Sequence, residues 1–471
     1  MKIAVPVLSI ALAAGSLWAA PRYPFPRNLA YPHGDVAVTS DSENIQDAYS
    51  DWLSNQYVES GNEARIAFDD ANYTVSEGIG YGMLIFVYMD NAQNNTQPKF
   101  DKLWTYYKNR RNGNGVMNWK IQGFNTGCDG TNCNGATDAE LDVALALLMA
   151  NKQWGSETYL TDAKSLIGAI RKSELDGSSL YKPGDAWNDY KNPSYFSAAA
   201  TELFKRVDAS NASTWSSVLA ANYDLLKKNV AKSSVGLPSD WCSTDGSPVS
   251  GNSVSYFYYD AVRVPWRLAI DYAWFGRAEA KTINSAITSW AVSTTSPIKN
   301  YAPYIKDGYN LDGTVASKAT GNVASFVGAF GTAGMSSNAT WAAKCYRQLK
   351  SGAAYDRYYH RCLKSLYMLL LSGNFNNFWD TTSTTGIDAQ SSALRADQFS
   401  VRQTGAQLAI SGLETSHLDA QLVDLAGRVQ RTATGSSELS MDVSGLSQGA
   451  YVLRLVTPKG SLSRTVALTG R

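Results

Sequence analysis

The chain has 471 residues, with 42 Lys and Arg against 41 Asp and Glu, so its formal net charge is only +1. This balance provides no electrostatic attraction to polyanions, and nucleic-acid binding is not expected. Apolar residues make up 44% and charged residues 18%, which excludes a disordered chain and supplies a large core. The 27 tyrosines and 13 tryptophans suit the binding of sugars, although large cores use the same residues.

Residues 1–20 have the composition of an export signal. Lys2 precedes an apolar run that ends in Ala19 and Ala20 and is short for a membrane span. We therefore expect a secreted or cell-surface protein whose signal peptide is removed near residue 20. A membrane anchor is the alternative for this segment, and no later stretch is long and apolar enough to cross a bilayer.

Export permits disulfide bonds. We expect one bridge between Cys128 and Cys133, which flank a loop rich in Gly and Asn, and a second between Cys345 and Cys362 on neighbouring predicted helices. These pairings leave Cys242 free. The cysteines contain no CxxC pair and the three histidines are scattered, so no metal site is expected.

Between residues 41 and 371, apolar residues recur with helical spacing, interrupted by loops rich in Gly, Asn, Ser and Pro. The pattern predicts roughly twelve helices, which could form a double ring of inner and outer helices, although a simpler bundle or a solenoid fits the same number. The predicted spans are 41–57, 76–91, 97–110, 137–153, 157–172, 193–208, 212–230, 260–276, 277–294, 320–334, 338–351 and 357–371.

The pattern changes near residue 376. Residues 377–395 are polar, rich in Thr and Ser and without period, which predicts a linker between a helical domain at 21–376 and a further domain at 396–471. The last segment alternates as short strands do, for example in Gln407-Leu-Ala-Ile and Ala450-Tyr-Val-Leu, and predicts a small β-sandwich.

Three predicted helices begin with a carboxylate. Glu77 lies in Thr74-Val-Ser-Glu-Gly-Ile-Gly-Tyr-Gly-Met, Asp138 in Gly135-Ala-Thr-Asp-Ala-Glu-Leu-Asp, and Asp260 in Tyr258-Tyr-Asp-Ala-Val-Arg-Val-Pro-Trp-Arg. Acidic residues favour the first helical turn simply because they complement the helix dipole, so each one alone is weak evidence for a site. These are the second, fourth and eighth predicted helices, however, and in a double ring the even-numbered helices run parallel. Their amino-terminal ends would then meet.

Converging carboxylates beside aromatic residues suit glycoside hydrolysis, which needs one protonated acid and one carboxylate. A helix amino terminus lowers a carboxyl pKa, whereas a general acid needs a raised one. Burial and repulsion from Asp138 or Asp260 would have to outweigh the dipole at Glu77.

At these motifs the chain resembles glycoside hydrolase family 8, most closely its bacterial endo-β-1,4-glucanases. The resemblance continues through Tyr181-Lys-Pro-Gly-Asp-Ala-Trp, Asn192-Pro-Ser-Tyr-Phe, Leu237-Pro-Ser-Asp-Trp-Cys and Leu371-Ser-Gly-Asn-Phe, and it covers residues 41 to 375. It implies an all-α (α/α)6 barrel that hydrolyses β-glycans with inversion and needs no metal or organic cofactor.

The resemblance also implies a role for each motif residue. Glu77 would be the general acid, Asp260 the general base that activates water, and Asp138 the residue that binds and distorts the sugar at the cleavage point. Tyr359, in the motif Tyr358-Tyr-His-Arg-Cys-Leu, would hydrogen-bond the attacking water. Arg263, one turn after Asp260, lies within ion-pair reach and would keep that carboxylate ionised and oriented. Inversion implies that the carboxyls of the acid and the base lie roughly 6.5–9.5 Å apart.

Trp119 and Trp187 are candidate platforms for sugar rings, with ordinary core packing as the alternative for both. The last domain resembles the sorting domain of type IX secretion substrates; a carbohydrate-binding module is disfavoured because Phe399 and Tyr451 are its only aromatic residues. The sequence thus predicts a secreted endo-β-1,4-glucanase acting on β-glucan. A xylanase, a chitosanase or a sugar-binding protein without activity are the alternatives.

Overall fold

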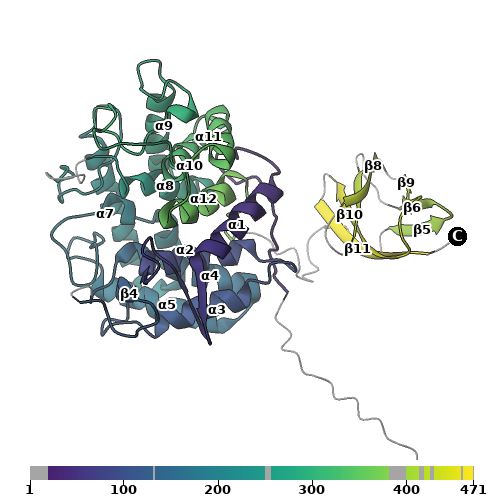
Figure 1. Cartoon of the computed structure of the whole chain (residues 1–471), viewed down its shortest axis with the longest axis horizontal. Coiled ribbons are helices and arrows are strands. Elements are labelled where there is room, and N and C mark those ends of the chain that lie inside the picture. Colours follow the sequence, from purple (N-terminus) through teal and green to yellow (C-terminus); the bar gives the residue numbers. More distant parts are fainter. Residues whose placement is uncertain are drawn as a thin grey trace, which may run out of the picture. The chain divides into compact units, whose positions relative to one another are not determined.

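A computed structural model describes residues 20–130, 133–249, 256–380, 399–412, 418–424, 429–436, 438–457 and 460–469. The chain divides into two compact units, with the division between Thr385 and Gly386. We call the described residues up to Asp380 the helical unit and those from Phe399 the β unit (Figure 1). The predicted signal peptide at 1–20 lies, except for Ala20, outside the described residues, and no described helix is long and apolar enough to cross a membrane.

The helical unit contains twelve α-helices within its described residues, and the spans expected from the sequence match them to within a few residues. They are α1 (Ser42–Gln56), α2 (Ser76–Met89), α3 (Gln97–Lys108), α4 (Thr137–Trp154), α5 (Glu157–Ser173), α6 (Ala198–Val207), α7 (Ala212–Val230), α8 (Val264–Phe275), α9 (Ala278–Val292), α10 (Ala324–Gly334), α11 (Ala339–Ser351) and α12 (Tyr358–Leu371).

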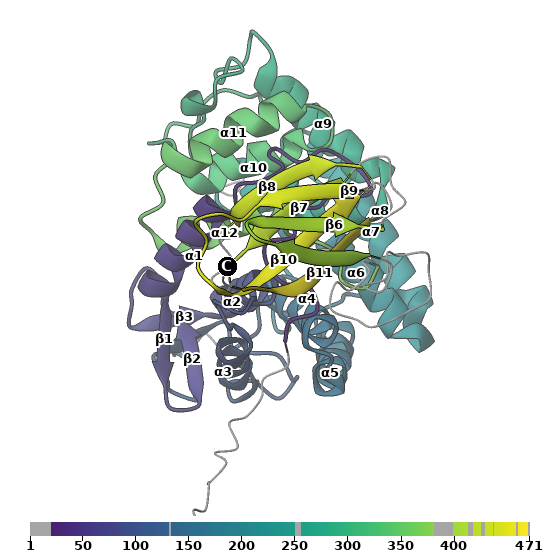
Figure 2. The same cartoon turned by 90° about the vertical axis from the view of Figure 1, so that its right-hand side faces the viewer.

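The even-numbered helices form the inside of this unit. In α4 every residue except Lys152 is buried, and in α2 every residue except Glu77, whereas α5 buries only a stripe at helical spacing that includes Leu166 and Ile170. The even-numbered helices pack in the order α2, α4, α6, α8, α10 and α12, with α12 also against α2, and each odd-numbered helix packs against an even-numbered one (Figure 2). Twelve helices in this arrangement fit an (α/α)6 barrel.

Three helices, α6, α8 and α10, begin four or five residues later than expected, and a proline explains the difference at α8. Pro193–Tyr195 forms a single 3-10 turn, capped by the Asn192 side chain, and the chain is extended before α6 starts. A second 3-10 turn, Ala261–Arg263, precedes α8, whose first turn contains Pro265. A proline has no N–H to donate, so it is accommodated in a first helical turn but not deeper.

Four short strands near the amino-terminal ends of α2 and α4 were not predicted. They are β1 (Tyr57–Ser60), β2 (Glu63–Ile66), β3 (Tyr73–Val75) and β4 (Lys120–Gln122). β3 pairs with β4 and leads directly into α2, and the Ser76 N–H donates to the Trp119 carbonyl at 2.9 Å. This pairing fixes the loop that carries Trp119 beside the start of α2.

The helical unit extends past residue 376, where the linker was expected to begin. Phe378 is buried and its ring stacks on Tyr23 with a centroid separation of 4.4 Å. Trp379 donates its indole N–H to the Leu148 carbonyl at 3.1 Å. The two aromatic residues anchor the end of this unit, which the polar composition around them concealed. The remainder of the expected linker, up to residue 395, lies outside the described residues.

The β unit is a two-layer sandwich of antiparallel sheets with strand orders β11-β10-β7-β8 and β5-β6-β9. Its strands are β5 (Ser400–Thr404), β6 (Gln407–Ser411), β7 (Leu418–Val423), β8 (Val429–Gly435), β9 (Glu438–Asp442), β10 (Gly449–Thr457) and β11 (Gly460–Leu468). Alternate residues of both sheets, including Leu408, Ile410, Leu422 and Leu453, form its own core. The β-sandwich expected from the alternating pattern is therefore present.

One of the two expected disulfides is present. Cys128 and Cys133 are bridged, with their Cα atoms 5.1 Å apart, and Cys242 is free as expected. The predicted bridge between Cys345 and Cys362 is wrong, because both thiols are free and buried in different helix interfaces. Cys362 accepts a hydrogen bond from the Trp52 indole on α1, whereas Cys345 lies against Gly331 of α10.

Candidate active site

The guanidinium of Arg263 binds three carboxylates that are far apart in the sequence. Its Nη1 donates to Glu77 Oε2 at 2.6 Å and to Asp138 Oδ2 at 2.5 Å, and its Nη2 donates to Asp260 Oδ1 at 2.8 Å. The arginine side chain is 2% exposed. The three predicted carboxylates therefore meet, as expected from the parallel inner helices, around a single buried cation.

Each carboxylate is placed by the start of an element. Glu77 and Asp138 are the second residues of α2 and α4, and Asp260 immediately precedes the 3-10 turn that leads into α8. Glycine 78 lets α2 approach α12, because a Cβ at this position would lie 3.0 Å from the Tyr358 hydroxyl. Gly80 does the same for α4, where a Cβ would lie 3.0 Å from that of Asp142. These two glycines therefore allow α2 to pack closely against both α12 and α4.

Glu77 has the electrostatic character of a general acid. Burial raises its pKa, the nearby Asp138 and Asp260 raise it further, and Arg263 and the Tyr358 hydroxyl oppose them, with a net pKa of about 7. The Tyr358 hydroxyl donates to Glu77 Oε1 at 2.9 Å. The side chain remains 19% exposed, so a ligand can reach this densely surrounded carboxyl.

Asp260 is held from two sides and is the most accessible of the three, with 30% of its side chain exposed. Besides Arg263, the Trp241 indole donates to its Oδ2 at 3.1 Å. The neighbouring Asp240 is buried and accepts the backbone N–H groups of Tyr258 and Ala261 at 2.9 and 2.7 Å, which fixes the turn around Asp260. An exposed, firmly held carboxylate is what a base acting on water requires.

Asp138 is almost fully buried, at 4% side-chain exposure, and burial raises its pKa against the opposing effect of Arg263 and Arg267. Its Oδ1 has no hydrogen-bond partner among the described residues. A buried oxygen without a hydrogen-bond donor is costly in free energy. Asp138 is less accessible than Glu77 and Asp260, so it is the least suited of the three carboxyls to act on a water molecule.

Aromatic residues surround Arg263 and its three carboxylates, which we call the arginine cluster. The Arg263 guanidinium lies over the ring of Tyr195, with its Cζ 5.3 Å from the ring centroid. Trp187 packs on Trp241, and their ring centroids are 4.9 Å apart. Trp187 is 38% exposed, which fits a sugar platform better than core packing, while Trp119 is only partly buried. The predicted Tyr359 donates its hydroxyl to the Tyr259 carbonyl at 2.5 Å, and the adjacent Tyr358 is the tyrosine that contacts Glu77.

Sequence reasoning missed the residues that hold the carboxylates rather than the carboxylates themselves. Trp241 and Asp240 lie in the motif Leu237-Pro-Ser-Asp-Trp-Cys, Tyr195 in Asn192-Pro-Ser-Tyr-Phe, and Tyr358 directly precedes the predicted Tyr359. Every one of these motifs was identified. Their contacts with Glu77, Arg263 and Asp260 depend on tertiary packing, which no local spacing encodes.

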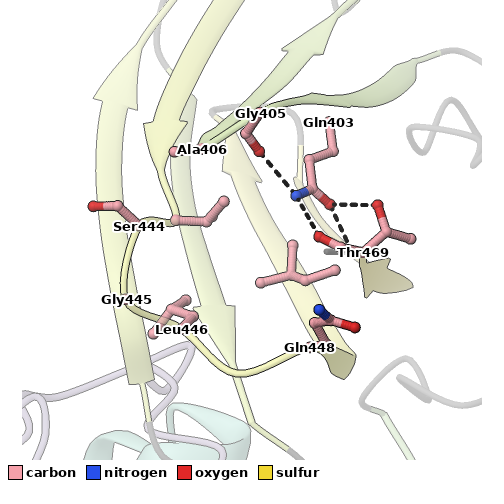
Figure 3. A pocket seen from close by; sticks show the side chains of 10 residues that line it. Gln403, Gly405, Ala406, Ser444, Gly445, Leu446, Gln448 and Thr469 are labelled. Carbon is pink, nitrogen blue, oxygen red and sulfur yellow. Dashed lines mark hydrogen bonds between the residues drawn. The ribbon is translucent and has the colours of Figure 1, made fainter. Parts of the chain in front are cut away.

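Neither a metal-binding group nor a second candidate active site is found among the described residues. The described residues contain no group of three or more His, Cys, Asp or Glu side chains arranged to hold a metal ion. In the β unit a hollow of about 250 Å³ lies beside Gln403, whose amide donates to the Gly405 and Thr469 carbonyls and whose carbonyl accepts the Thr469 N–H (Figure 3). Its lining includes no aromatic and no acidic residue.

The arginine cluster can perform acid and base chemistry on one substrate. A carboxyl that stays protonated near neutral pH lies beside an exposed carboxylate, with a third carboxylate and aromatic rings between and around them. This is the equipment for cleaving a glycosidic bond.

A family model described as "Glycosyl hydrolases family 8" matches residues 23–373. The chain belongs to this family. It is 37% identical over 386 residues to Endoglucanase 2 of Ruminiclostridium josui, covering 78% of this chain and 80% of that protein. It is 27% identical over 352 residues to a reducing end xylose-releasing exo-oligoxylanase of Halalkalibacterium halodurans, covering 68% and 84%.

A solved structure agrees with the fold of the helical unit. The apo structure of a beta-1,3-1,4-glucanase from Paenibacillus sp.X4 superposes with a TM-score of 0.69 at 27% identity, covering 75% of this chain and 99% of that one. Family membership and these relatives establish that this family 8 protein is a glycoside hydrolase with endoglucanase homologues. The matched region corresponds to the helical unit and excludes the β unit.

Proposed function

We propose that this family 8 enzyme is a secreted, inverting endo-β-1,4-glucanase built on a closed (α/α)6 barrel. The single observation that carries the mechanism is the shared guanidinium of Arg263, which gathers Glu77, Asp138 and Asp260 at one site. The endoglucanase names of its relatives at 35–37% identity support the glucan substrate.

In the proposed reaction the protonated Glu77 gives its proton to the glycosidic oxygen as the bond to the anomeric carbon breaks. Asp260 accepts a proton from a water molecule, whose oxygen attacks the anomeric carbon from the opposite face. Asp138 binds the sugar at the cleavage point and distorts it. Tyr359 hydrogen-bonds the attacking water. Glu77 ends ionised and Asp260 protonated, and proton exchange with solvent restores both.

Membership of family 8 supports inversion, which the resemblance of the motifs implied. Glu77 and Asp260 bind different nitrogens of the Arg263 guanidinium. Inverting enzymes need a gap between acid and base for the attacking water, whereas retaining enzymes bring the two carboxyls closer.

Xylan is the second candidate substrate, because the exo-oligoxylanase of Halalkalibacterium halodurans matches 68% of this chain. Trp187 and Trp119 would stack equally well on glucose and xylose rings. The distinction depends on room for the hydroxymethyl group that only the hexose carries.

The test is hydrolysis of carboxymethylcellulose, mixed-linkage β-glucan, xylan and chitosan, each followed by reducing-end release, with Glu77→Gln as the control for contaminating activity. We expect release from the two glucans, a rapid fall in viscosity typical of internal cleavage, and α-anomeric products by NMR. Release mainly from xylan would replace the substrate and retain the mechanism. β-Anomeric products would overturn inversion.

Export is a separate proposal. The composition of residues 1–20 supports a signal peptide, and the separate β-sandwich at the carboxyl end supports a type IX sorting domain. Phe399 and Tyr451 are both buried, which argues against a sugar-binding role for the β unit. In a host with a type IX system, the full chain should reach the cell surface or medium, and a chain ending at residue 385 should remain in the periplasm. Equal export of both would exclude the sorting role.

A further inference from the structure

A second group of carboxyls surrounds the first turn of α4 without contacting either Arg263 or Arg267. Glu140 lies on α4, two residues after Asp138, and Glu174 immediately follows α5. Both are completely buried, at 0% exposure. The reaction proposed above uses neither of them.

These two carboxyls lack the partners that ionised groups require. The Tyr107 hydroxyl donates to Glu140 Oε1 at 3.0 Å, but Glu140 Oε2 and both oxygens of Glu174 have no hydrogen-bond donor among the described residues. The Thr137 hydroxyl lies close enough to Glu174 to lower its pKa but falls short of hydrogen-bond geometry. Neither carboxyl forms an ion pair within the described chain, and Lys182 directs its ammonium at the Asp185 carbonyl, 2.6 Å away.

Asp142, on the same helix and also buried, has the partners that Glu140 and Glu174 lack. Both of its oxygens are bound by the two Nη atoms of Arg267. A buried carboxylate without such compensation is strongly unfavourable, whereas a protonated carboxyl is neutral and supplies a donor of its own.

We propose that Glu140 and Glu174 both stay protonated in the working enzyme and, as a neutral pair, position Asp138 at the start of α4. Protons on these carboxyls supply O–H donors where the protein offers none, which accounts for the unpartnered oxygens. The segment entering α4 lies directly against the pair, because a Cβ at Gly135 would be 3.1 Å from Glu174 Oε1. The catalytic consequence rests on the proposed function, whereas the protonation does not.

The electrostatic surroundings agree with a neutral pair. Burial raises the pKa of both carboxyls well above the ordinary range; Glu174 raises that of Glu140 further, and Asp185 that of Glu174. The titratable and charged groups that face the pair are Asp138 on α4, Tyr107 on α3, and Tyr181, Lys182 and Asp185 in the loop after α5. Two additional negative charges here would repel the carboxylate of Asp138.

The first test is infrared spectroscopy of the full-length protein at pH 8, where a protonated carboxyl absorbs apart from carboxylates. Glu140→Gln and Glu174→Gln should each remove intensity from the protonated-carboxyl band of the wild type. Glu77 and the buried Asp240 are present in all three proteins, so the difference spectra isolate the pair. Loss of carboxylate intensity instead, with the protonated band unchanged, overturns the proposal.

The second test uses the alkaline limb of kcat/KM, which reports the ionisation of Glu77. Removing a nearby negative charge would lower the pKa of Glu77 and move that limb to lower pH. Replacing a neutral carboxyl with glutamine removes no charge, so both glutamine variants should keep the limb of the wild type. A shift to lower pH in either variant shows that the pair is ionised and overturns the proposal.

The positioning role is tested by comparing Glu140→Ala with Glu140→Gln. The alanine variant removes the contact with Tyr107 and leaves a cavity beneath the turn that carries Asp138, so kcat should fall by about tenfold or more while KM changes little. Glutamine has the shape of the protonated glutamate and should restore kcat. Wild-type kcat in the alanine variant, or an equal loss in both variants, overturns the positioning role.

Unfolding in urea provides the matched control. Asp142→Asn removes a carboxylate paired with Arg267 and should lower the midpoint strongly, whereas the two glutamine variants, which no longer take up a proton on folding, should unfold at or above the wild-type midpoint at neutral pH. The raised pKa of the pair also predicts that wild-type stability decreases as pH rises above the unfolded value of a glutamate, and that each glutamine variant loses part of this dependence. A glutamine variant as unstable as Asp142→Asn overturns the proposal. These measurements need no substrate, so they separate its failure from failure of the proposed function.

Discussion

Two arginines one helical turn apart have different charged surroundings. Arg263 and Arg267 are four residues apart and face Asp138 and Asp142, which are four residues apart on α4. Arg267 binds one carboxylate with both Nη atoms, so that pair is neutral. Arg263 is shared by three carboxylates, so its surroundings carry excess negative charge unless one carboxyl keeps a proton.

The comparison shows how one scaffold separates stability from chemistry. At Arg267 charge is balanced and both partners are about 1% exposed, which is the arrangement of a structural pair. At Arg263 charge is unbalanced, and burial together with repulsion from Asp138 and Asp260 raises the pKa of Glu77 to about 7. The same residue types thus give a fixed ion pair between Arg267 and Asp142, which we call the neutral layer, and a reactive acid at Arg263.

The largest expected effect comes from neutralising the acid or the base at Arg263. Glu77→Gln and Asp260→Asn should each lower kcat by about 10²- to 10⁴-fold, the usual contribution of a general acid or base, with KM changed much less. Kinetics on the best glucan substrate measure this. Glu59→Gln, which removes a carboxylate from a surface pair with Lys102, is the matched control and should keep wild-type rates. Wild-type rates in Glu77→Gln would exclude it as the acid.

The second test changes the cation while keeping its charge. In the wild type, kcat/KM should fall as pH rises through about 7, because Glu77 must be protonated to act. Arg263→Lys cannot serve three carboxylates through two fixed nitrogens, so kcat should fall about 100-fold. Since Arg263 lowers the pKa of Glu77, the weaker contact should also move the alkaline limb to higher pH.

Arg267→Lys is the control for that experiment. It alters the neutral layer and should leave the alkaline limb where it is. An equal shift in both variants would mean that the two arginines are not electrostatically distinct.

The third test measures what the neutral layer contributes to stability. Arg267→Met leaves Asp142 buried without a partner, and breaking a buried pair in this way costs about 3–5 kcal/mol. Urea unfolding gives the loss in the free energy of unfolding. Replacing both partners, as Arg267→Met with Asp142→Leu, should recover much of it. No recovery would show that the pair is needed for more than mutual neutralisation.

The helices, the strands of the β unit and the three carboxylates at Arg263 were accessible from the sequence because each depends on local pattern, whereas the short strands β1–β4 were not. Apolar spacing located all twelve helices, and the position of Glu77, Asp138 and Asp260 at element starts predicted that they would converge. The length of the helical unit was misjudged, because the anchoring Phe378 and Trp379 lie in a stretch of polar composition.

Charge sharing could not be predicted in the same way. The spacing of Asp260 and Arg263 indicates an ion pair, but nothing in it indicates that Arg263 also reaches Glu77 and Asp138, 186 and 125 residues away. The absent bridge between Cys345 and Cys362 has the same origin. Each helix packs against several neighbours, and the sequence alone does not show whether two cysteines on adjacent helices lie in the same interface.

The smallest effect is expected at the uncharged wall of the Arg263 site. Trp187→Ala removes an exposed ring that packs on Trp241, so KM should rise by roughly three- to tenfold, the range of one aromatic contact, while kcat stays close to the wild type. Trp187→Phe should recover most of the affinity. Trp241→Ala is the contrasting variant: its indole also donates to Asp260, so kcat should fall as well. If both variants changed only KM, the bond from Trp241 would not be needed to hold the base, and the charges at Arg263 alone would position Asp260.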